Sequence, residues 1–103
     1  MRKMKMNGAM NKYIEEVKNF IENELYYPYG EQEFKYKATD PENLKIIADC
    51  WTVELDFKYN IFSFFTKKGC GCNTTDLDFF IEVKDNMDVI SDMFYGIKRN
   101  SYE

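Results

Sequence analysis

Residues 52–66 read TVELDFKYNIFSFFT, and this stretch decides the fold. Its first part alternates apolar with polar residues, the apolar positions being Val53, Leu55, Phe57 and Tyr59. Alternation with a period of two residues is typical of a half-buried strand. After a reversal near Tyr59 and Asn60, residues 61–66 predict a second strand. The short connection favours antiparallel pairing of the two.

The flanking segments predict further strands. Residues 34–38 alternate aromatic or small residues with charged ones, and residues 77–83 place Leu77, Phe79, Ile81 and Val83 at alternate positions. Both patterns indicate strands. Residues 67–75 contain two glycines among polar residues and predict a loop.

Helices are predicted at both ends of the chain. From about Met10 to Leu25 the apolar residues recur at spacings of three and four, which indicates an amphipathic helix. A last helix is expected to begin after Asp85 and to end near Lys98 and Arg99. Residues 41–51 are compatible with two states: Asp40 and Pro41 favour a helix start, whereas Ile46, Ile47 and Trp51 also suit a strand.

Together these segments predict an α+β fold, with an antiparallel sheet of three to four strands and helices packed on one face. The chain has 103 residues, which is enough for one core. We expect residues 1–9 to form a flexible basic tail and residues 10–103 to form a single α+β domain.

The net charge of −4 is unevenly distributed. The first twelve residues carry four basic and no acidic residues, so the remainder carries −8. An acidic body repels phosphate backbones, which disfavours direct binding of nucleic acid. The same charge would attract a basic surface on another protein, or would simply keep the domain soluble.

Compartment and reactivity are also constrained by the sequence. No apolar run is long enough to span a membrane, and no secretory signal follows the basic N-terminus. With three cysteines, a fully paired disulfide scaffold is impossible within one chain. We therefore expect a cytoplasmic protein of a bacterial host cell. The absence of histidine removes the commonest general base, so we expect no enzyme activity.

The cysteines form the most suggestive cluster. Cys70 lies between Gly69 and Gly71, Cys72 follows Gly71, and the predicted hairpin would bring Cys50 close to residue 69. Three thiolates could bind a structural zinc, with Asp76 preferred over Asp49 as the fourth ligand. Free thiols without a role, and a disulfide or redox pair, are the alternatives.

Aromatic residues provide candidate contact surfaces. Tyr26, Tyr27 and Tyr29 crowd a turn with Pro28 and could anchor a partner protein, or could cover the rim of the core with their hydroxyls in water. Five phenylalanines are assigned to the faces of the sheet: Phe62, Phe64, Phe65, Phe79 and Phe80. If one face is uncovered, those that point to it would mark an interface.

In length, acidity and richness in Lys, Asn, Ile, Phe and Tyr, the chain resembles the small acidic proteins of phages and mobile elements. Among these it is most similar to the anti-CRISPR proteins that inhibit Cas9-type nucleases. The resemblance is one of general character, so no functional residue is carried over. It implies binding to the nuclease and a block of DNA loading or cleavage. The alternatives are a thiol-based metal or redox sensor and a structural phage protein.

Overall fold

The computed structural model describes residues 2–26, 32–40 and 42–93, and it places side chains in residues 11–26, 32–38 and 42–93. The elements, in chain order, are α1 (Arg2–Phe20), η1 (Ile21–Leu25), β1 (Lys35–Asp40), β2 (Asn43–Ile47), β3 (Trp51–Asp56), β4 (Ile61–Thr66) and α2 (Thr74–Asp85). After a turn at Asn86, residues 87–93 are again helical. None of the helices in these ranges is long and apolar enough to cross a membrane.

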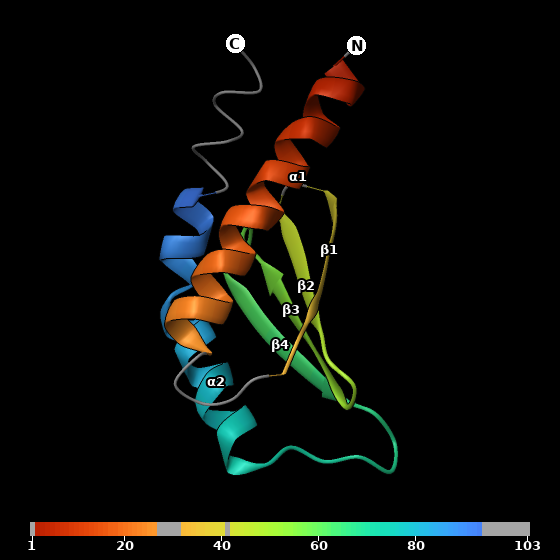
Figure 1. Ribbon diagram of the computed structural model, residues 1–103, viewed down its shortest axis with the longest axis vertical. Coiled ribbons are helices and arrows are strands. Elements are labelled where there is room, and N and C mark those ends of the chain that lie inside the picture. The colour runs from red at the N-terminus through yellow and green to blue at the C-terminus, as the bar shows by residue number, and fades with distance from the viewer. Residues whose placement is uncertain (1, 27–31, 41, 94–103) are drawn as a thin grey trace.

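The four strands form one antiparallel sheet in the order β1-β2-β3-β4 (Figure 1). Each strand therefore pairs with its neighbour in sequence, as short connections require. The register aligns Leu44 of β2 with Leu55 of β3, and Leu55 with Phe62 of β4. Because residues in register share a face, these side chains form one continuous row across the sheet.

One face of the sheet is covered by the helices, and the other is open. In β3, Trp51, Val53 and Leu55 are buried, whereas the alternate residues are partly exposed. In β2, Leu44 and Ile46 are fully buried while Lys45 is exposed. The predicted α+β class, with helices packed on one face of an antiparallel sheet, is confirmed.

The structure resolves the ambiguity at residues 41–51 in favour of a strand. Asn43–Ile47 pairs with β1 on one side and with β3 on the other. Asp40 pairs with Asn43, so the segment that resembled a helix start connects two paired strands. A helix there would have left the inner edges of β1 and β3 unpaired, which is costly for buried backbone groups.

The strand predicted at residues 77–83 is wrong, because this segment belongs to α2. Phe79, Phe80 and Val83 are buried at helical spacing, while Leu77 and Ile81 are exposed. The helix begins with a reciprocal cap. The Asp76 backbone N–H donates to the Asn73 side chain at 2.8 Å, and the Asn73 N–H donates to the Asp76 carboxylate at 3.2 Å. This capping box provides partners for donors that a helix start leaves unbonded.

The N-terminal helix is longer than the sequence predicts. Its backbone is helical from Arg2, where a tail was expected, and it ends in the π-helical turn η1. Tyr13, Val17, Ile21 and Leu25 form its buried stripe. The Tyr36 hydroxyl of β1 donates to the Glu22 carboxylate at 2.9 Å, and this contact ties η1 to the sheet. Burial, with Glu22 next in weight, raises the pKa of Tyr36.

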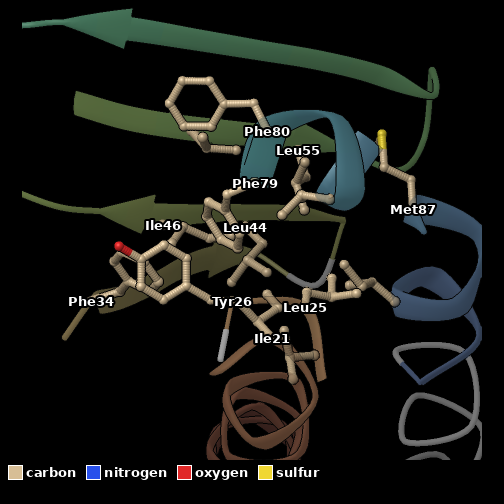
Figure 2. Packing of buried hydrophobic residues seen from close by; sticks show 14 of the residues in the cluster. Ile21, Leu25, Tyr26, Phe34, Leu44, Ile46, Leu55, Phe79, Phe80 and Met87 are labelled. Carbon is tan, nitrogen blue, oxygen red and sulfur yellow. The ribbon is translucent and has the colours of Figure 1, made fainter. Parts of the chain in front are cut away.

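Aromatic rings fill the core between the two layers. Trp51 of β3 contacts Phe79 and Phe80 of α2, with ring centroids 5.8 and 4.8 Å apart. Phe34 stacks on Phe79 at 5.2 Å. Figure 2 shows side chains from η1, β2, β3 and α2 converging in this one cluster. Such contacts add specific geometry to the burial of large apolar areas.

We expect substitution of the helix cap Asn73→Ala to lower the free energy of unfolding by about 1 kcal/mol, because the Asp76 backbone N–H loses the side-chain oxygen that it donates to. Thr74→Ala, in the first turn of the same helix, is the matched control and should change stability little. Urea unfolding of both variants measures the difference. Equal effects of the two substitutions would contradict the capping role.

Candidate functional site

A disulfide joins Cys50, between β2 and β3, to Cys70, in the loop after β4. Their Cα atoms lie 5.5 Å apart, a spacing that disulfides commonly span. The hairpin register explains the approach. The Lys67 N–H donates to the Cys50 carbonyl at 2.9 Å, which extends the β3–β4 ladder by one pair. The sequence placed Cys50 beside residue 69, whereas the actual register places it beside Lys67.

A tight turn returns Cys70 to Cys50. The Cys70 N–H donates to the Lys67 carbonyl at 3.0 Å, and Gly69 within this turn has a φ of 86°. Side chains with a Cβ rarely adopt this conformation, so a glycine is needed at that position. The turn therefore closes the loop end of β4 against the start of β3.

Cys72 does not join the disulfide. It is a free thiol, partly buried against the edge of the core near the start of α2. Burial, and secondarily the carboxylate of Asp76, raises the pKa of Cys72. A raised pKa leaves little thiolate at neutral pH, which is the opposite of a reactive sensor cysteine.

The structure does not bring the predicted zinc ligands together. Cys50 and Cys70 are bonded to each other, and Asp76 is engaged in the cap of α2. Within the described residues, no three Cys, Asp or Glu side chains converge as a metal site requires. The zinc site stays a prediction, and the described side chains do not form a set of ligands for it. What the arrangement provides is the disulfide that the sequence left as an alternative.

The tyrosine cluster is only partly described. Tyr26 is buried, with its ring 4.7 Å from that of Phe34 and 4.8 Å from that of Phe79. A partner anchor at Tyr26 would need an accessible ring, whereas this ring packs in the core. Burial and the nearby Asp76 raise its pKa. Tyr27 and Tyr29 lie outside the described residues.

A shallow depression lies beside the disulfide. Its volume is about 150 Å³, and it is lined by Glu33, Lys35, Ile47, Ala48, Asp49 and Lys67. Sites for small molecules generally start near 300 Å³ and are mostly apolar. This small polar depression does not match such a site, so the broader surfaces are the stronger candidates.

The two layers of the fold differ in charge. Residues 11–26 and 73–93 of the helical layer contain ten acidic and three basic residues, and residues 2–10 of α1 add three basic residues and no acidic one. Residues 32–72, which include the sheet, contain six of each. Seven acidic side chains of the helical layer are exposed: Glu15, Glu16, Glu24, Asp78, Asp85, Asp88 and Asp92. We call these seven residues the acidic helical face.

A second surface is apolar and lies around β4. Ile61 and Phe65 point to the open face of the sheet, since each pairs with a partly exposed residue of β3. Phe64 lies on the helix side, with its ring 4.6 Å from that of Phe80, and it still stays exposed. The sequence identified these phenylalanines as an interface if one face was uncovered. It did not identify Leu77 and Ile81 of α2, which were assigned to a strand.

Comparison with protein-family models, with curated proteins and with solved structures finds no match to this chain. The functional argument therefore rests on the surfaces themselves.

Reduction of the Cys50–Cys70 disulfide should lower the free energy of unfolding by about 3 kcal/mol, as expected for a crosslink spanning a separation of 20 residues. Cys50→Ser should have a similar effect, whereas Cys72→Ser in the oxidised protein should have little. Thermal unfolding with and without reductant measures this. Three titratable thiols in protein kept under oxidising conditions would contradict the disulfide.

We also expect alkylation of Cys72 to be slow at neutral pH and to accelerate only at a pH above that of an ordinary thiol, because its pKa is raised. Iodoacetamide labelling followed by mass spectrometry, across a pH series, measures the midpoint. The same protein unfolded in urea is the control. A midpoint in the folded protein at or below that of the control would contradict the raised pKa.

Proposed function

We propose that this chain is a protein-binding inhibitor that presents its acidic helical face to the basic nucleic-acid-binding surface of a partner. The observation that carries the proposal is the separation of charge between the two layers of the fold. Over residues 2–26 and 73–93, ten acidic residues stand against six basic ones, three of which lie at the N-terminal end of α1, while residues 32–72 are balanced. The exposed negative charge therefore gathers on the helical side, away from the open face of the sheet.

Such a face favours one kind of partner. Negative charges gathered on one side attract a positively charged groove more strongly than the same charges dispersed over the surface. Complementary charge speeds the encounter and orients it. A groove that binds DNA or RNA carries lysines and arginines for the phosphates, so an acidic protein that occupies it would exclude the nucleic acid.

The resemblance to anti-CRISPR proteins supplies the partner to test, a Cas9-type nuclease. Binding would then block DNA loading and, with it, cleavage. The alternative of a thiol-based sensor is less well supported, because a sensor cysteine needs a low pKa and that of Cys72 is raised.

The test compares two charge-reversed variants with the same change in net charge. Glu16→Lys/Asp85→Lys alters the acidic helical face, and Glu33→Lys/Asp49→Lys alters exposed acids outside it. We expect the first to weaken binding to the nuclease by about tenfold or more, since it places positive charge against a basic groove. The second should change binding much less. Calorimetry at two salt concentrations measures both, and binding should weaken as salt rises.

The nuclease should be tested both free and loaded with guide RNA and target DNA. Binding to the loaded complex should be weaker if the chain occupies the nucleic-acid groove. Equal losses in the two variants would reject the acidic helical face as the contact surface. Absence of binding to the free nuclease would reject this partner.

A further inference from the structure

β4 is an edge strand whose outer backbone has no partner among the described residues. The direction of each backbone group follows from the ladder. The Lys67 N–H bonds to Cys50, so the odd-numbered residues of β4 point their N–H and C=O groups toward β3. The groups of Phe62, Phe64 and Thr66 therefore point outward, where another strand could pair with them.

The two edges of the sheet differ. β1 carries Lys35 and Lys37, and its register shifts between Lys37 and Asp40. Lysines and irregular register are devices that prevent an edge from pairing with another chain. β4 reads IFSFFT, and it has regular register and no charged residue. Only the β4 edge is suited to accept a strand.

We propose that β4 pairs antiparallel with β4 of a second copy of this chain, around a two-fold axis through Ser63. In this register Phe62 faces Phe64 of the second copy, and Ile61 faces Phe65 of the second copy. Each of these pairs lies on one face of the sheet, as antiparallel pairing requires. Phe62 and Phe64 also direct their backbone groups outward, so they can exchange hydrogen bonds. Every apolar residue of the strand then contacts another apolar residue.

Exposed apolar residues of α2 also favour a second copy of this chain as the partner of β4. A helix turns by about 100° per residue, so Leu77 and Ile81 lie on the flank of α2 next to Phe80. Phe80 contacts Phe64 of β4, and this flank is therefore the one on the side of β4. Leu77 and Ile81 are 45% and 56% exposed, respectively. Across the two-fold axis, the same flank of the second copy would lie opposite and cover them.

This dimer does not depend on the proposed function, although it has a consequence for it. A two-fold axis perpendicular to the sheet keeps both helical layers on the same side. The two acidic helical faces would then form one longer negative surface.

The test measures the molar mass of the full chain by size-exclusion chromatography coupled to light scattering, over a range of protein concentrations. The mass should rise from 12.4 kDa toward twice that value as concentration increases. Ile61→Lys alone and Phe65→Glu alone should each shift the chain to monomer by placing a charge against an apolar partner. Both side chains are half exposed on the open face, so the variants should fold, as circular dichroism would check.

The double variant Ile61→Lys/Phe65→Glu makes the test specific for the register. Each lysine would face a glutamate of the second copy, so dimerisation should return. Ile47→Lys, on the same face but on β2, is the matched control and should stay dimeric. A monomer at all concentrations, or single variants that still dimerise, would overturn the proposal. Failure of the double variant to dimerise would overturn this register.

The salt dependence of dimerisation distinguishes this proposal from the proposed function. Each copy carries a net charge of −4, so the two copies of the dimer repel one another. Screening this repulsion should strengthen the dimer as salt rises, whereas binding of the acidic helical face to a basic partner should weaken. A dimer that dissociates in high salt would contradict an apolar contact through β4, and it would leave the partner proposal intact.

Discussion

The packing of α2 on the inner face of β3 is the contact on which the rest of the structure depends. Trp51 of β3 contacts both Phe79 and Phe80, and Phe34 contacts both Trp51 and Phe79. This contact closes the core between the layers. It also determines where the loop after β4 must run, because that loop has to return the chain from the edge of the sheet to the helix above it.

The disulfide lies in this returning loop. Cys50 is held by the last pair of the β3–β4 ladder, and Cys70 reaches it through the turn at Gly69. The disulfide fastens this loop to the segment before β3, three residues ahead of the cap of α2 at Asn73. Cys50 and Cys70 therefore stabilise the fold. The surfaces of the two layers are the candidates for binding other proteins.

The two candidate surfaces follow from one asymmetry of the fold. Helices cover a single face of the sheet, so their outer sides are free to carry the exposed acids, while the sheet ends in an edge strand with no charge. Neither surface needs a cavity of the size that small-molecule ligands require. Both proposals therefore depend on contact through an extended surface.

The sequence by itself determined the hairpin of β3 and β4, the helix that contains Val17 and Ile21, and the α+β class, because local periodicity reports which side chains share a face. Residues 77–83 show its limit. Their alternation suits a strand, whereas the contact of both Phe79 and Phe80 with Trp51 requires a helix, which begins at the capping box of Asn73 and Asp76. The disulfide, the burial of Tyr26 and the exposure of β4 were decided by tertiary structure, because each depends on residues far apart in sequence.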